Sequence, residues 1–165
     1  MKIIYLLLSA MIYVSCNTQT EAKNKNRIDG NESRLLPGVN IALTFINDYT
    51  KFCNSQNPAL NTMDWLNQNQ LITDNFKKTY KKLQDKAIKD DPELGLDFDP
   101  IFDAQDFPDK GFELMSCDLK SGYVTVKGKD WPAFILVLKV VYKNNKWQVD
   151  GAGVINIPEA RRAKR

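Results

Sequence analysis

The chain has 165 residues, no histidine, three cysteines and a formal net charge of +3. This near-neutral balance argues against nucleic acid as a partner, because dedicated nucleic-acid-binding domains usually carry a strong basic excess. The absence of histidine excludes histidine-dependent catalytic triads and histidine-based zinc sites. Any catalysis would have to rest on Asp, Glu, Tyr, Lys or Cys, and the sequence suggests no cofactor.

Residues 1–15 have the pattern of a signal peptide. Lys2 precedes an apolar run from Ile3 to Val14, which is followed by Ser15 and Cys16. A basic start, about a dozen apolar residues and a small residue predict a secretory signal, and a helix of that length reaches roughly 18 Å, too short to cross a bilayer. A cysteine at this point is typical of a bacterial lipoprotein signal.

We therefore expect cleavage before Cys16, acylation of that residue and a periplasmic location, with the membrane as a partner through the acyl chains. Asn17 takes the place of the aspartate that retains lipoproteins in the inner membrane of enteric bacteria, so the outer membrane is favoured. The alternative is a plain secreted protein in which the cysteine lies there by chance. Residues 16–36 are polar and lack periodicity, which predicts a flexible tether.

Three helices are expected next. Pro37 is a favoured first-turn residue, and the apolar stripe after it predicts an amphipathic helix that ends before Asn57-Pro58. Asn61 or Thr62 would cap a short second helix. Thr73-Asp74 would cap a third, which carries the apolar stripe Phe76, Tyr80, Leu83 and Ala87.

Beyond Gly111 the apolar period changes to two, which predicts strands over 112–120, 123–127, 133–143 and 146–157. Asn144-Asn145 suits a two-residue turn at positive φ, and this fixes a hairpin register. In it Tyr142 faces Trp147 and Val140 faces Val149. Further along, Lys139 would face Asp150, Leu138 would face Gly151, and Leu136 would face Gly153. Helices followed by an antiparallel meander predict one α+β domain over residues 37–157, with helices on one face of a curved four-stranded sheet.

The segment between the last helix and the first strand is the most distinctive. It contains Asp97, Asp99, Pro100, Ile101, Asp103, Ala104, Gln105, Asp106 and Phe107. With the terminal Trp147, this block resembles a family of bacterial lipoproteins known only as a domain of unknown function. The resemblance covers roughly residues 37–157. It implies the nuclear-transport-factor-like, cystatin-like cone fold and an envelope location, and it implies no activity.

From the residues alone, three interpretations of this block remain open. Asp99 could cap a turn at Pro100 while Gln105 and Asp106 brace the loop. Asp97, Asp99, Asp103 and Asp106 could hold calcium, although the spacing is not that of a calcium loop. Gln105 and Asp106 could instead form the rim of a pocket or a surface for a protein partner.

Two further pairs of residues have alternative explanations. In the predicted register Gly151 and Gly153 lie on the helix-covered face, where they either allow close packing or leave room for a ligand. Cys53 and Cys117 are both expected to point into the core. A bridge between them would contribute about 4 kcal/mol in the chain-entropy model, but buried cysteines also serve as apolar filling.

The chain ends in a basic tail, residues 158–165, for which we expect disorder, with weak attachment to anionic lipid or wall polymer as the alternative. For function, the sequence favours a non-catalytic module that binds a small ligand or an envelope protein. One alternative is a periplasmic immunity or inhibitor protein that uses an acidic loop over 90–111. Another is a small enzyme that pairs Asp106 or Asp150 with Tyr123 or Tyr142.

Overall fold

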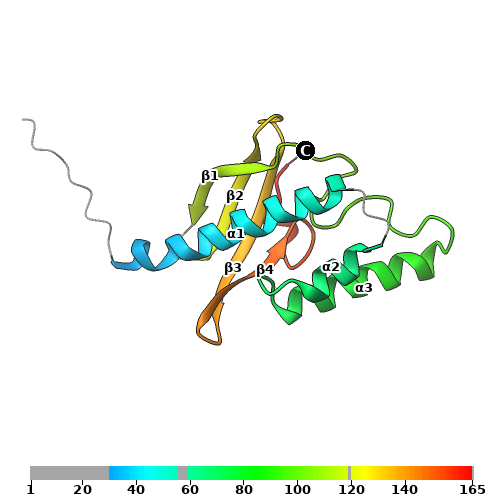
Figure 1. Cartoon of the computed structure of the whole chain (residues 1–165), viewed down its shortest axis with the longest axis horizontal. Coiled ribbons are helices and arrows are strands. Elements are labelled where there is room, and N and C mark those ends of the chain that lie inside the picture. Colours follow the sequence, from blue (N-terminus) through cyan, green and yellow to red (C-terminus); the bar gives the residue numbers. More distant parts are fainter. Residues whose placement is uncertain (1–29, 56–58, 119, 165) are drawn as a thin grey trace, which may run out of the picture.

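A computed structural model describes residues 30–55, 59–118 and 120–164 (Figure 1). Its elements in chain order are α1 (Gly30–Ser55), α2 (Thr62–Gln68), α3 (Asp74–Asp90), β1 (Phe112–Asp118), β2 (Tyr123–Gly128), β3 (Ile135–Lys143), β4 (Lys146–Ala152) and the 3₁₀ helix η1 (Glu159–Arg161). The strands form one antiparallel sheet in the order β1-β2-β3-β4, which does not close into a barrel. The predicted α+β class and meander are confirmed.

The helix caps follow from the sequence, but the start of α1 does not. Asn61 accepts a hydrogen bond from the backbone N–H of Asp64, and Thr73 accepts one from that of Phe76, as the cap rules predict. Helix α1 begins at Gly30, so Pro37 lies inside it and the last part of the predicted tether is helical. The predicted start at Pro37 is wrong, because this proline costs the helix one backbone hydrogen bond without ending it. Residues 16–29 lie outside the described residues.

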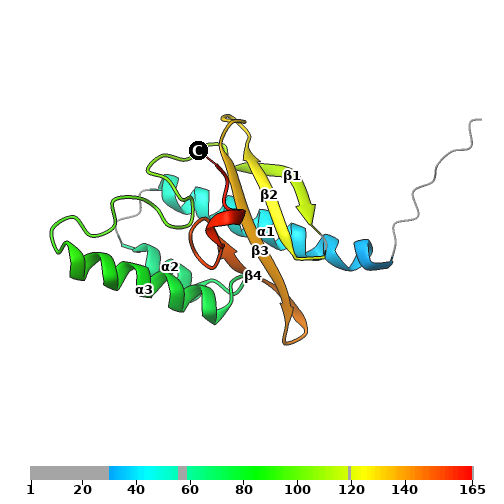
Figure 2. The ribbon, with the colours of Figure 1, turned by 180° about the vertical axis from the view of Figure 1, so that it is seen from behind.

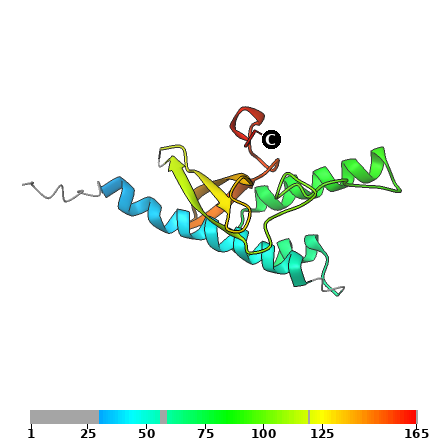
Figure 3. The ribbon, with the colours of Figure 1, turned by 90° about the horizontal axis from the view of Figure 1, so that it is seen from above.

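Helix α1 lies across one face of the sheet and supplies much of the core (Figure 3). Its inward residues Ala42, Phe45, Ile46 and Tyr49 are completely buried. They meet the alternate inward residues of the sheet, among them Val124, Val126, Leu136 and Leu138. None of the helices in the described ranges is both long and apolar enough to cross a membrane.

The β3–β4 hairpin is in the predicted register only near its turn. Asn144 and Asn145 have φ of 51° and 60°, and Tyr142 pairs with Trp147 as expected. A bulge after Val140 then shifts the register by one residue, so Lys139 pairs with Gly151 and Leu138 with Ala152. The predicted pairs of Lys139 with Asp150 and Leu138 with Gly151 are therefore wrong, because a bulge inserts one extra residue and reverses the faces beyond it.

The outer edge of β4 is covered by the segment that joins α2 to α3. The N–H of Val149 donates to the carbonyl of Leu71 (2.8 Å), and the N–H of Thr73 donates to the carbonyl of Val149 (3.0 Å). The buried amide of Gln148 donates to the carbonyl of Ile72 at 2.8 Å. These bonds fix the start of α3 against β4, and α3 lies beside this edge in Figure 1.

The C-terminal segment covers part of the sheet face opposite α1 (Figure 2, Figure 3). Strand β4 ends at Ala152, short of the predicted end, and the chain turns back through a bond from the N–H of Ala152 to the carbonyl of Ile155 (3.0 Å). Arg161 lies 4.9 Å from the ring centre of Tyr123, and Arg162 Nε donates to the carbonyl of Ile157 (3.1 Å). The expectation of a disordered tail is wrong as far as Arg162, because cation–π and backbone contacts hold the segment up to that residue.

Candidate functional site

The distinctive block lies in the loop between α3 and β1, and its first half forms a tight turn. The backbone N–H of Asp99 donates to the carbonyl of Ala104 (2.9 Å), and the reverse bond is 3.3 Å long. Within this turn Asp99 Oδ1 accepts from the backbone N–H groups of Ile101 (2.7 Å) and Phe102 (3.0 Å). This is the capping role expected for an aspartate directly before a proline.

The turn is joined to α1 by a partly buried hydrogen bond. Tyr49, which is completely buried, donates its hydroxyl to Asp99 Oδ2 at 2.6 Å. Burial raises the pKa of Asp99, while the hydrogen bonds from Tyr49 and from the turn oppose that shift. Burial and the nearby Asp99 charge raise the pKa of Cys53 and of Tyr80 to about 12. Both groups therefore stay neutral near pH 7. Because its carboxylate accepts hydrogen bonds from the turn and from Tyr49, Asp99 serves as an anchor for the loop rather than as a ligand.

The two glycines of the last strand do not open a cavity. A Cβ on Gly153, which has φ of +58°, would lie 2.4 Å from the carbonyl oxygen of Pro100. A Cβ on Gly151 would lie 2.8 Å from the carbonyl oxygen of Ile155. The interpretation that their missing side chains leave room for a ligand is wrong, since backbone already fills both positions. Gly153 instead lets the end of β4 pack against the turn that contains Pro100.

The second half of the block faces solvent and lines a hollow of about 450 Å³ (the Trp131 hollow). Gln105 and Asp106 form one side of it. Trp131 and Phe134, from the loop between β2 and β3, form the other side. The remaining lining residues are Ala104, Ala133 and Lys164. Three segments distant in sequence thus meet around one depression, which includes both residues predicted as a pocket rim.

Trp131 is the largest exposed aromatic surface in this hollow, with 46% of the residue exposed. Its ring meets that of Phe134 edge-on, with ring centres 5.2 Å apart. The N–H of Phe134 also donates to the carbonyl of Trp131 at 2.9 Å. Because Phe134 is almost fully buried against Phe112, these contacts connect the exposed indole to the core. Trp131 was not among the predicted site residues, although a tryptophan in a predicted turn between strands was a usable signal.

The polar rim of the Trp131 hollow is partly fixed and partly free. Gln105 Nε2 donates to the carbonyl of Asp97 (3.1 Å), which orients the amide and leaves its oxygen available as an acceptor. Asp106 is exposed and forms no ion pair with a described residue. Lys164 supplies the one cation among the lining residues. The rim therefore offers a ligand the amide oxygen of Gln105, the carboxylate of Asp106 and the ammonium group of Lys164.

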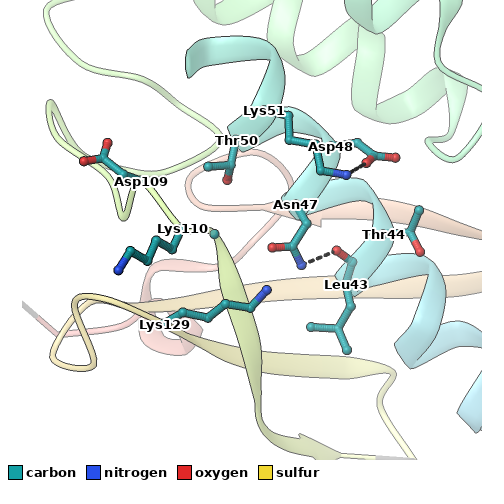
Figure 4. Close-up of a pocket in the computed structure, with 10 residues that line it drawn as sticks. Leu43, Thr44, Asn47, Asp48, Thr50, Lys51, Asp109, Lys110 and Lys129 are labelled. Carbon is teal, nitrogen blue, oxygen red and sulfur yellow. Dashed lines mark hydrogen bonds and ion pairs between the residues drawn. The ribbon is translucent and has the colours of Figure 1, made fainter. Parts of the chain in front are cut away.

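A second hollow, of about 420 Å³, lies between α1 and the start of β1 (the lysine hollow; Figure 4). It is lined by Lys51, Lys110 and Lys129 and by the acids Asp48 and Asp109, among others. Lys51 pairs with Asp48 at 2.9 Å. This hollow was not predicted, because its residues come from three separate segments with no motif in common.

Asn47 forms the wall between α1 and the sheet in the lysine hollow. Its Nδ2 donates to the carbonyl of Phe112 (3.1 Å), and its Oδ1 accepts from the N–H of the same residue (2.8 Å). The side-chain amide thus pairs with the free edge of β1 as another strand would. Acids and lysines are mixed in this hollow and Asn47 is fully engaged, so its lining does not converge on one ligand chemistry.

Other predicted sites are not assembled. The ranges that the structure describes contain no group of three or more His, Cys, Asp or Glu residues that could hold a metal ion, and the calcium interpretation of Asp97, Asp99, Asp103 and Asp106 lacks support. The candidate catalytic pairs do not meet in any described contact. Asp150 accepts from Thr73, and Tyr142 donates to Asn145 (2.8 Å).

The two described cysteines are free and differ in burial. Cys53 is half-buried in α1, whereas Cys117 is exposed on the edge strand β1. The prediction that Cys117 is part of the core is wrong. It pairs with the buried Val124, but it is exposed because β1 lies at the open edge of the sheet. The candidate disulfide is absent from the described residues. Cys16, the candidate lipidation site, lies outside them.

Comparison of the chain with protein-family models, with curated proteins and with solved structures finds no match in any of the three.

Proposed function

We propose that this protein is a non-catalytic binding module of the bacterial envelope and that its ligand binds in the Trp131 hollow. The observation that carries the proposal is the meeting of Gln105 and Asp106 with the exposed, core-anchored indole of Trp131 around about 450 Å³ of space. Ligand sites typically combine an apolar surface with a few convergent polar groups in a space of this size. The volume suits a small molecule or one segment of a longer chain.

The proposed location follows from the first residues. Signal removal before Cys16 and acylation there would anchor the domain to a membrane on its periplasmic side, with the outer membrane favoured by Asn17. A Cys16→Ala variant should lose membrane association in fractionation while the unmodified protein remains with the membrane. Equal membrane association of both forms would refute the lipid anchor.

Native mass spectrometry tests binding in the Trp131 hollow. The purified full chain is incubated with a small-molecule extract of bacterial cells, desalted and measured as an intact species. Wild type and Tyr142→Ala should retain the same adduct, and Trp131→Ala should lose it. Tyr142 is a matched control, because it is 58% exposed and lies on the β3–β4 hairpin, outside the lining of the hollow. An adduct that is absent from all three proteins, or equal in all three, would refute the proposal.

One observation favours the immunity or inhibitor protein as a second candidate. The loop between α3 and β1 exposes Asp91, Glu93, Asp97, Asp106 and Asp109, and none of them pairs with a cation among the described residues. Such a surface would complement a basic partner and speed its association at low salt. Capture of a basic protein by wild type, lost both in 0.5 M salt and in a Glu93→Lys, Asp97→Lys variant, would support this candidate.

A further inference from the structure

We infer that the ligand of the Trp131 hollow is a neutral, hydroxyl-rich molecule, specifically a short saccharide chain. This inference rests on the proposed function and names the ligand class for the same site. It follows from three properties of the lining: the shape of its aromatic surface, its charge, and its balance of hydrogen-bond donors and acceptors.

The exposed aromatic surface of the hollow consists of one ring system, the indole of Trp131. Trp131 is exposed, whereas Phe134 is only 4% exposed and meets the indole edge-on at 64° between ring planes. A cage for a quaternary ammonium group needs several ring faces around one point. A single exposed indole instead suits a ligand with a flat apolar side, such as the C–H face of a sugar ring, which buries apolar area on contact.

The charge of the lining does not favour a ligand that carries a net charge of either sign. Asp106 and Lys164 are the charged residues of the hollow, and their formal charges cancel. A cationic ligand would gain from Asp106 and lose to Lys164, and an anionic ligand would meet the reverse. Neither kind of ligand gains a net electrostatic attraction, since both side chains are also exposed to solvent that screens their charges.

The hydrogen-bond inventory favours a ligand that both donates and accepts hydrogen bonds. The Asp106 carboxylate only accepts, and one of the two N–H groups of the Gln105 amide is bound to the carbonyl of Asp97, so Gln105 offers its oxygen and its second N–H. Sugar hydroxyls both donate and accept, so they can serve Gln105 and Asp106 as donors and Lys164 as an acceptor. A fatty chain would leave these rim groups unmatched.

Isothermal titration calorimetry tests the ligand class on the full chain with Cys16→Ser, which avoids acyl chains and sugar detergents. The probes are chitotetraose, cellotetraose and maltotetraose, with tetramethylammonium and citrate as charged probes. We expect at least one tetrasaccharide to bind with 1:1 stoichiometry. Trp131→Ala should weaken that binding tenfold or more, Trp131→Phe less, and Asp106→Asn about fivefold. The controls Tyr142→Ala and Asp97→Asn should bind as wild type does, and unfolding midpoints confirm that each variant is folded.

The outcomes separate the ligand class from the site. Binding of tetramethylammonium or citrate that depends on Trp131, with none of any tetrasaccharide, would overturn the saccharide class and leave the hollow as a binding site. Tetrasaccharide binding that Trp131→Ala leaves unchanged would overturn the inference as well. Absence of binding by every probe would also overturn it, and the adduct experiment with Trp131→Ala would then decide the proposed function separately.

Discussion

Asp99 and Asp106 belong to the same short block, yet the fold gives them opposite environments. Asp99 accepts three hydrogen bonds, two from its own turn and one from the buried hydroxyl of Tyr49. Asp106 is exposed at the rim of the Trp131 hollow. The first half of the block therefore attaches the loop to the core, and the second half presents polar groups to solvent.

This difference shows why residue type alone does not assign a role. Both residues are aspartates in a loop, and both were candidates for ligand binding. What separates them is whether donors of the same chain already occupy the carboxylate. An exposed and unpaired carboxylate offers all of its acceptor positions to a ligand, whereas one that already accepts three hydrogen bonds offers few. The variants below test this division, from the largest expected effect to the smallest.

Asp99→Ala should cause the largest loss of stability, about 3 kcal/mol in the free energy of unfolding. The substitution leaves the N–H groups of Ile101 and Phe102 and the hydroxyl of Tyr49 without their acceptor, and a buried group left unsatisfied costs about 1–3 kcal/mol. Urea unfolding followed by circular dichroism measures the change. Asp97→Ala is the control, because Asp97 is exposed in the same block, and it should change stability by about 0.5 kcal/mol or less. Equal effects of the two variants would contradict the division.

Gly153→Ala should destabilise by about 2 kcal/mol or more, because it adds left-handed strain and a clash with the carbonyl of Pro100. Gly95→Ala provides a matched comparison. Gly95 has φ of +64°, but its added Cβ would meet only Ile88 at 3.8 Å. It should therefore show the strain alone, about 1 kcal/mol. If both variants lose the same stability, the close approach of β4 to the turn is not a tight contact.

The pH dependence of stability should carry the signature of the partly buried Asp99. Its pKa is raised in the folded state, mainly by burial, so the folded protein holds this proton to a higher pH than the unfolded chain does. Its contribution to stability is complete below the unfolded pKa, near pH 4, and is lost as pH rises through the folded pKa. Cys53 and Tyr80, with pKa values of about 12, do not titrate in this window.

The measurement compares wild type with Asp99→Asn by urea unfolding between pH 4 and pH 7. The free energy of unfolding of wild type, relative to the variant, should fall as pH rises. Subtracting the variant removes the contribution of carboxylates that behave in the opposite way, such as Asp118, whose pKa is lowered by its hydrogen bonds with Ser121 and Lys120. A relative stability that rises with pH would show that the hydrogen bonds to Asp99 outweigh its burial.

The fold could be predicted because its signals are local. Helix caps at Asn61 and Thr73, the change of apolar period beyond Gly111 and the Asn144-Asn145 turn each act within a few residues. Together they were sufficient for three helices and a four-stranded meander. The predictions were wrong where one inserted residue changes the register of all the residues after it. The bulge after Val140 reverses the faces of β4, and no local propensity marks its position.

The candidate site could be predicted only in part, for a related reason. Gln105 and Asp106 were identified as a rim because their block is unusual in composition. Trp131 and Lys164 were missed because they reach the same hollow from the β2–β3 loop and from the C-terminal tail. A contact between segments so far apart is a product of the tertiary fold. The lysine hollow was not predicted for the same reason, because its residues share no sequence pattern.

Asp106→Asn should have the smallest effect on stability, a change of about 0.5 kcal/mol or less, since the carboxylate is exposed and unpaired. Gln105→Ala should cost about as little, because its hydrogen bond to the carbonyl of Asp97 is also exposed. Urea unfolding of both variants beside Asp99→Ala makes the comparison complete. If Asp106→Asn instead costs more than about 1.5 kcal/mol, the second half of the block is structural too. In that case a loss of binding in this variant would reflect a disturbed loop, and the rim would have to be tested through Trp131 alone.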